Sequence, residues 1–151
     1  MYQHLLIPTD GSELAERAVT HGLSLAKFVG AKVTVIVVVE QFGAWVPPFA
    51  GRAAAEELVR HTEQFKKHAA TVLDRVANAA KHAGVPCDTI QVEDMQPYEA
   101  IIATATNRGC DLIVMASHGR GGLSAAVLGS VTNKVLTYTK AFTKVPVLVI
   151  Q

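Results

Sequence analysis

The chain has 151 residues, of which 50% are hydrophobic and 18% charged, and its formal net charge is +1. This length suits a single domain over residues 1–151 that buries a hydrophobic core. The near balance of charge, without a basic patch, argues against a nucleic acid or a membrane surface as partner. No apolar run is long enough to span a bilayer, and no secretory signal opens the chain. Cys87 and Cys110 form no C-x-x-C motif, so we expect free, buried, inert thiols in the cytoplasm.

The first elements alternate between strand and helix patterns. Residues 2–8 form a short apolar run that ends at the turn and cap residues 9–12. Ser12 is a good N-cap for a helix whose apolar residues recur at helical spacing up to Gly30. Residues 31–39 are almost all β-branched, which predicts a strand that is covered on both faces.

The alternation continues to the end of the chain. Residues 40–51 contain two prolines and two glycines and are expected to form a loop, either a mobile lid or an interaction patch around Trp45. A long helix with Leu58 and Phe65 on its apolar face should follow and end at Gly84. We expect the elements after the loop to be a helix over 52–83, a strand over 86–93, a helix over 97–107, a strand over 112–116, a helix from 130 to about 140 and a strand over 146–150.

Five strands alternating with four helices predict an α/β fold with one doubly wound, open, parallel sheet. We expect the strand order 3-2-1-4-5, with helices on both faces. Strands 1 and 4 are then neighbours at the point where the winding reverses, and ligands bind beyond the carboxyl ends of strands at such a point. The turns over residues 8–12 and 116–130 should therefore face each other.

The segment 112–134, which reads LIVMASHGRGGLSAAVLGSVTNK, has the pattern of an anion-binding loop. An apolar strand ends in a loop of small residues, and a helical pattern begins at Gly129 and Ser130. Glycines let backbone N–H groups approach a phosphate, and the N-terminus of a helix attracts negative charge. The segment matches neither the Walker A pattern nor the dinucleotide fingerprint. It predicts a nucleotide-binding module of another kind.

Three segments resemble signatures of the universal stress protein family: LLIPTDGS near the start, VMASHGRGGLSAAVLGSVTNKVL, and VPVLVI at the end. The ATP-binding branch of that family has a glycine, two residues, a second glycine, nine residues, and then glycine with Ser or Thr. Gly119 and Gly129-Ser130 keep this spacing, whereas Ala116 replaces the first glycine. In the family that glycine lies against the ribose, so the methyl group of Ala116 is either tolerated there or crowds the sugar. The family's fold is of the adenine nucleotide alpha hydrolase-like type.

The resemblance implies that the ligand is an adenine nucleotide, ATP or else ADP or AMP, with Mg²⁺ accompanying the phosphates. Asp10 would accept hydrogen bonds from the ribose hydroxyls, and backbone groups of Val38 or Val39 would meet the adenine edge. The resemblance implies a ribose wall formed by Pro8, Thr9 and Asp10. The base and nucleoside would contact Val38, Val39, Met115 and Ala116. The phosphates would contact Gly119, Arg120, Gly129, Ser130 and Val131.

Some of these residues have a simpler interpretation. Residues 10–12 also suit a plain helix cap, and Arg120 either reaches a phosphate or is solvated. His118 invites an acid–base role, but no acidic partner stands at a suggestive spacing. The remaining histidines suggest no metal site and are expected to be isolated polar residues: His4, His21, His61, His68 and His82.

The final strand, Val145 to Ile150, is expected at a sheet edge, apolar and without charge. In the family the corresponding strand joins its counterpart across a two-fold axis, so the resemblance implies a homodimer.

We expect a cytoplasmic protein that binds ATP and acts as a stress-response sensor or regulatory module. One alternative is an enzyme, either a slow ATPase or a protein that phosphorylates itself, although the sequence offers no positioned base for it. A second alternative is an interaction protein whose pocket binds no nucleotide.

Overall fold

The computed structural model describes residues 1–41, 46–119 and 127–151. In this part of the chain the elements follow the order expected from the sequence, with bounds that differ by at most two residues. They are β1 (His4–Pro8), α1 (Glu13–Val29), β2 (Lys32–Glu40), α2 (Gly51–Ala83), β3 (Cys87–Asp94), α3 (Pro97–Asn107), β4 (Leu112–Ala116), α4 (Ser130–Phe142) and β5 (Val147–Ile150).

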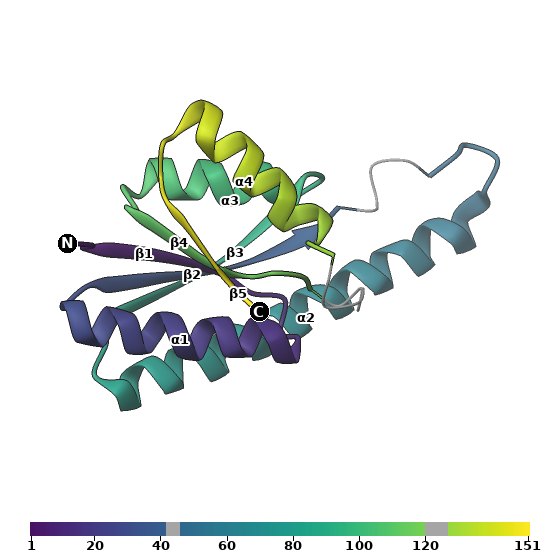
Figure 1. The fold of residues 1–151 in the computed structure, drawn as a ribbon. Coiled ribbons are helices and arrows are strands. Elements are labelled where there is room, and N and C mark those ends of the chain that lie inside the picture. Colours follow the sequence, from purple (N-terminus) through teal and green to yellow (C-terminus); the bar gives the residue numbers. More distant parts are fainter. Residues whose placement is uncertain (42–45, 120–126) are drawn as a thin grey trace.

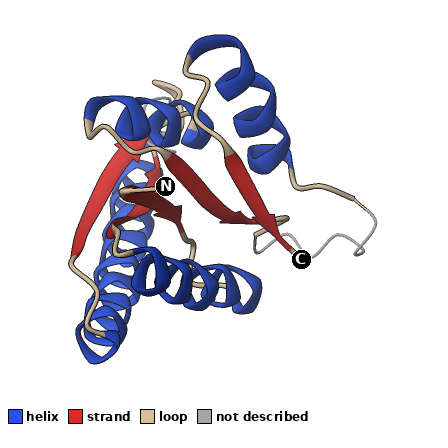
Figure 2. Ribbon diagram, turned by 60° about the vertical axis from the view of Figure 1, so that its left-hand side comes forward, coloured by secondary structure: helices blue, strands red, loops and turns tan. Residues whose placement is uncertain are grey.

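The five strands form one parallel sheet in the order β3-β2-β1-β4-β5. The predicted fold class and strand order are therefore confirmed. Helices α1 and α2 cover one face of the sheet, and α3 and α4 cover the other (Figures 1 and 2). Strand β1 lies between β2 and β4, and its residues Leu5, Leu6 and Ile7 are fully buried.

Two hydrophobic cores lie on the two faces of the sheet, because alternate residues of a strand point to opposite faces. Leu5 and Ile7 pack on the side of α1 and α2, whereas Leu6 packs with Ile113 and Val135 on the side of α3 and α4. A strand that is buried on both faces has no polar alternation, which explains its continuous apolar sequence. Within the described residues, no helix is both long and apolar enough to cross a membrane.

Helix α2 extends well beyond the sheet (Figure 1). Its 33 residues span about 50 Å at the rise of an α-helix, whereas the 9 residues of β2 span about 30 Å. The buried residues of α2 begin at Ala69; Leu58 is only half-buried, and Phe65 is 39% exposed. The apolar face that the sequence predicts along this helix is therefore buried only in its second half, because the first half has no sheet to pack against.

The two cysteines differ in exposure. Both are free thiols; Cys110 is buried, whereas Cys87 is half-buried, so the expectation that both are buried is wrong for Cys87. Burial raises the pKa of each thiol to about 11, and a neighbouring acidic residue acts in the same direction. A thiol that stays protonated is a poor nucleophile, so inert behaviour follows for both.

The prediction that His4 is an isolated polar residue is also wrong, because this side chain is buried at the end of the sheet opposite the turns. Its Nδ1 lies 3.1 Å from the Arg108 carbonyl oxygen, and its Nε2 lies 2.8 Å from the Thr34 hydroxyl. A carbonyl oxygen only accepts, so Nδ1 donates and, in the neutral ring, Nε2 accepts from Thr34. The Asp111 carboxylate accepts the N–H groups of Gln3 and His4. Together these bonds connect β1 to β2 and to the start of β4.

We expect His4 to make stability depend on pH. Burial first, and then the nearby Lys32, lower the pKa of His4 from its ordinary 6.5. The unfolded chain then binds more protons than the folded one, so stability is complete above pH 6.5 and falls as the pH drops from there towards the lowered folded value. Urea unfolding at about pH 5 should give a lower free energy of unfolding than at about pH 8. The variant His4→Gln should lose part of this difference, whereas His21→Gln, on the exposed side of α1, should keep it. An equal pH dependence in both variants would contradict the assignment.

Candidate functional site

Two adjoining cavities lie beyond the carboxyl ends of the central strands, with volumes of about 420 Å³ and about 190 Å³. They meet where β1, β2 and β4 end and where α4 begins. The lining residues that the two cavities share are Asp10, Val38, Glu40, His118, Gly119, Val131 and Thr132. This is the point at which the winding of the sheet reverses, where ligands bind in folds of this kind.

Every described residue of the predicted nucleotide site lines at least one cavity. The larger cavity alone is lined by Val39, Gly129 and Ser130. The smaller cavity alone is lined by Pro8, Thr9, Met115 and Ala116, and both are lined by Asp10, Val38, Gly119 and Val131. Arg120 and Trp45 lie outside the described residues, so the expectations for them stay predictions.

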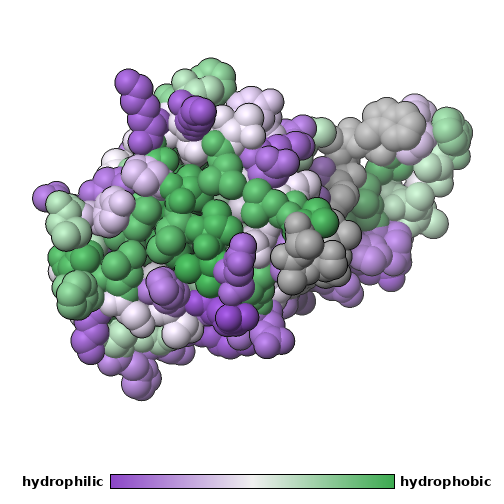
Figure 3. Space-filling view, viewed as in Figure 1, coloured by the Kyte–Doolittle hydropathy of each residue, from purple (hydrophilic) through white to green (hydrophobic). Residues whose placement is uncertain are grey.

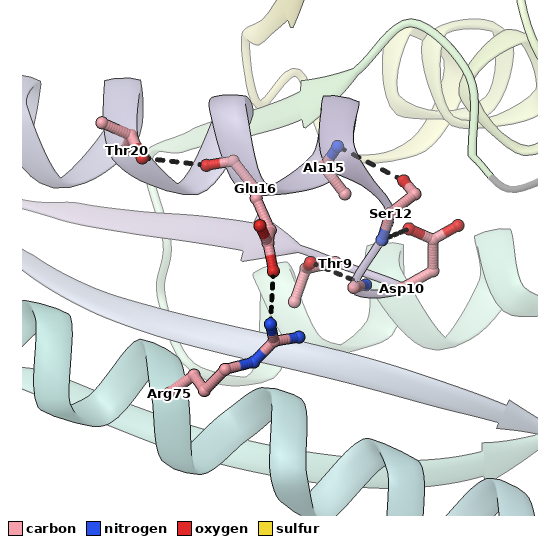
Figure 4. Close-up of polar contacts among 8 residues, drawn as sticks. Thr9, Asp10, Ser12, Ala15, Glu16, Thr20 and Arg75 are labelled. Carbon is pink, nitrogen blue, oxygen red and sulfur yellow. Dashed lines mark hydrogen bonds and ion pairs between the residues drawn. The ribbon is translucent and has the colours of Figure 1, made fainter.

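The turn after β1 is held by a short series of side-chain hydrogen bonds (Figure 4). The Thr9 hydroxyl accepts from the N–H of Gly11 at 3.2 Å, and Asp10 Oδ1 accepts from the N–H of Ser12 at 3.0 Å. Ser12 caps α1 by accepting from the N–H of Ala15 at 3.3 Å. The cap interpretation of this turn is therefore correct, and it does not conflict with a place in the site.

The second carboxylate oxygen of Asp10 points away from the turn (Figure 4) and lies against Gly119. A methyl group at position 119 would overlap this oxygen. Gly119 thus allows the segment after β4 to come directly against the acidic group of the turn after β1. The two turn clusters do face each other, as the predicted strand order required.

The start of α4 lies against the end of β4. The N–H of Gly129 donates to the Ser117 carbonyl oxygen at 2.7 Å, and the buried Thr132 hydroxyl donates to the Ala116 carbonyl oxygen at 2.8 Å. A Cβ at position 129 would lie 2.9 Å from the His118 Cα, a backbone atom that cannot easily move aside. The first N–H groups of a helix lack intrahelical acceptors and carry partial positive charge. Here they belong to Ser130, Val131 and Thr132, which line the cavities.

Ala116, which departs from the glycine pattern, is 8% exposed. Its side chain packs with Ala15 and Ala18 of α1. These two residues are themselves small, so the extra methyl group is accommodated against the helix. This packing favours the interpretation in which the substitution is tolerated.

The charges that surround the cavities are mostly acidic. Asp10 and Glu40 contribute carboxylates, and no lysine or arginine is found among the described residues that line either cavity. His118 lies with its Nδ1 3.2 Å from the Ser117 hydroxyl. The described residues include no group of three His, Cys, Asp or Glu side chains that could hold a metal ion. A bound anion would therefore depend on backbone N–H groups and imidazoles.

One wall of the larger cavity was missed by the sequence analysis. It consists of Phe65, His68 and Ala69 of α2, together with Glu40 at the end of β2. Phe65 and Ala69 belong to the apolar face that the sequence predicts for this helix, although only Ala69 is buried. Nothing local to His68 indicates a cavity, because the wall arises only when α2 packs across the end of β2.

The chain matches the sequence model of the universal stress protein family over residues 1–151. A universal stress protein of Methanocaldococcus jannaschii, MJ0531, is 33% identical over the whole chain and 83% of its own length. The solved structure of protein MJ0577 of Methanocaldococcus jannaschii is 27% identical with a TM-score of 0.80, over 99% of this chain and 96% of that one. A universal stress protein solved in complex with cAMP is 24% identical with a TM-score of 0.69, over 99% and 97% of the two chains.

We expect Thr132→Val to destabilise the protein by about 1–3 kcal/mol, because it leaves the buried Ala116 carbonyl without its side-chain donor. Thr139→Val is a matched control in the same helix. The Thr139 hydroxyl is also buried, but it donates to carbonyl groups of its own helix, those of Val135 at 2.7 Å and Leu136 at 3.4 Å. Urea unfolding of both variants should show the larger loss for Thr132→Val. Equal losses would contradict a tertiary role for this hydrogen bond.

Proposed function

The chain belongs to the universal stress protein family, and we propose that it binds an adenine nucleotide, ATP in the first place, in the two adjoining cavities. In this proposal it acts as a cytoplasmic regulatory module of the stress response. The observation that carries the proposal is the close backbone approach at the two glycines. Gly129 lies on the Ser117–His118 backbone and Gly119 lies on Asp10, both where α4 opens towards the cavities.

The chemistry of the walls suits the parts of a nucleotide. The smaller cavity has an apolar wall that includes Ile36, Ile101 and Met115, as a planar base requires. Asp10, at the junction of the cavities, is an acceptor suited to ribose hydroxyls. The N–H groups at the start of α4 suit phosphates.

A related structure supports the class of ligand. A universal stress protein of the same fold was solved with cAMP, an adenine nucleotide. A cyclic monophosphate lacks the polyphosphate chain of ATP, so the preference for ATP rests on the larger cavity, about 420 Å³, which is lined by Gly119, Gly129 and Ser130. We include Mg²⁺ in the proposal because Asp10 and Glu40 would otherwise repel a polyphosphate.

Calorimetric titration with ATP and Mg²⁺, and then with AMP, tests the proposal. We expect ATP to bind more tightly than AMP, and Gly129→Val to weaken ATP binding at least tenfold, about 1.4 kcal/mol, by displacing the backbone of the cradle. Thr137→Val, on the exposed side of the same helix, should bind like the unchanged protein. Thermal unfolding should show that the Gly129 variant is folded. Undiminished ATP binding in a folded Gly129→Val would refute the phosphate cradle.

We also propose that the protein forms a homodimer through β5. This strand ends the sheet next to β4, and its four residues are apolar and half-buried. An apolar area lies over β5 between α1 and α4 (Figure 3). Exposed edges of this kind pair with another strand, and a second copy supplies an identical apolar strand in antiparallel orientation.

The backbone pattern of β5 allows a sharp test. The carbonyl groups of Pro146 and Ile150 accept hydrogen bonds from Ile113 of β4 and from Ser117, the residue after β4, so by alternation the backbone groups of Val149 point to the open edge. Val149→Pro removes an outward donor only, and we expect it to convert a dimer into a folded monomer. Light scattering after size exclusion should give twice the chain mass for the unchanged protein and the single mass for the variant. A monomeric unchanged protein, or a dimeric variant, would contradict the proposed interface.

A further inference from the structure

The α2 wall places an imidazole opposite the proposed phosphate cradle. His68 lines the larger cavity, which also contains Gly119, Gly129 and Ser130. A Cβ at Gly11 would lie 3.2 Å from His68 Nε2, so the ring lies beside the turn that carries Asp10. The imidazole therefore lies at the junction between α2 and the turn after β1, across the cavity from the start of α4.

The charges around His68 come from several elements. Asp10 and Glu40 contribute negative charge from the ends of β1 and β2, and His118 faces the same cavity from the segment after β4. On α2 itself, Lys66 pairs with Glu93 at 2.7 Å and Arg75 pairs with Glu16 at 2.9 Å. These two cations are held by acidic partners on β3 and α1. Among the described lining residues, positive charge is available only from His68 and His118.

Of the two imidazoles, His118 is tied to the cradle itself. Its ring contacts the Ser117 hydroxyl, and its backbone meets Gly129. His68 lies instead on α2, which forms another wall of the larger cavity, and this residue is exposed.

We propose that His68 takes up a proton when the phosphates of a nucleoside polyphosphate enter the larger cavity, so that affinity rises as the pH falls. The inference rests on the proposed nucleotide binding. Histidine is the side chain whose charge changes between about pH 5 and pH 8, and a nearby anion favours its charged form. The protonated protein then binds the polyphosphate more tightly, and by linkage binding draws a proton from solution.

Calorimetric titration with ATP and Mg²⁺, in two buffers of different ionisation enthalpy, measures both affinity and proton uptake. For the unchanged protein we expect net uptake, and an affinity several-fold higher at about pH 6 than at about pH 8. His68→Gln should show a smaller pH dependence and less proton uptake than the unchanged protein. His68→Lys carries a permanent charge, so its affinity should also change less between the two pH values. AMP should show a smaller difference, because its single phosphate is held by the cradle.

A matched control is His61→Gln, seven residues earlier on α2. His61 lies outside both cavities and pairs with Glu57 at 3.3 Å. This variant should reproduce the proton uptake of the unchanged protein. Protonation of the ATP phosphates themselves is the same in every titration, so it cancels when variants are compared.

The outcomes separate this inference from the proposed function. ATP binding whose pH dependence and proton uptake survive in His68→Gln overturns the role of His68 and leaves nucleotide binding intact. A His68→Lys variant that keeps the full pH dependence of the unchanged protein also overturns it. Absence of ATP binding at every pH overturns both.

Discussion

The contact between Gly129 and the Ser117–His118 backbone is the constraint on which the site depends. It brings the first turn of α4 onto the end of β4, where the Gly129 nitrogen lies 2.7 Å from the Ser117 carbonyl oxygen. A larger residue at position 129 would require a backbone shift, because its Cβ would lie 2.9 Å from the His118 Cα. The Thr132 hydroxyl holds the same turn to the Ala116 carbonyl from the buried side. With both contacts in place, the helix N-terminus opens directly onto the cavities. Without the Gly129 and Thr132 contacts, α4 would still pack on α3, but the N–H groups of its first turn would not be fixed relative to the cavities.

The rest of the fold positions the opposing walls. Because β1 lies between β2 and β4, the turn that carries Asp10 meets the segment that carries Gly119. Residues at the ends of β1, β2 and β4 line the cavities, and Phe65, His68 and Ala69 of α2 form a side wall of the larger one. Helix α2 itself continues beyond the sheet (Figure 1). The site is therefore assembled from segments that are far apart in sequence, and only the sheet order brings them together.

Much of this was predictable from the sequence because the signals are local. The β-branched run at 31–39 and the small residues after β4 each specify their own structure, and the alternation of elements then implies the strand order. Three other features were not predictable, because they arise only from contacts between segments that are far apart in the sequence. His4 looks isolated until β1, β2 and Asp111 come together, and Phe65 looks buried until the helix is seen to outrun the sheet. His68 gains its place only from the packing of α2 across the turn after β1.

The location of the ligand is the central claim, and amide NMR of the isotope-labelled protein tests it most directly. Titration with ATP and Mg²⁺ should shift the amide signals of Asp10, Gly119, Gly129 and Ser130, at the junction of the two cavities. Signals at the opposite end of the sheet, such as those of His4 and Asp111, should stay in place. Shifts confined to that far end, or no shifts at saturating ATP, would contradict the assignment of the nucleotide to this site.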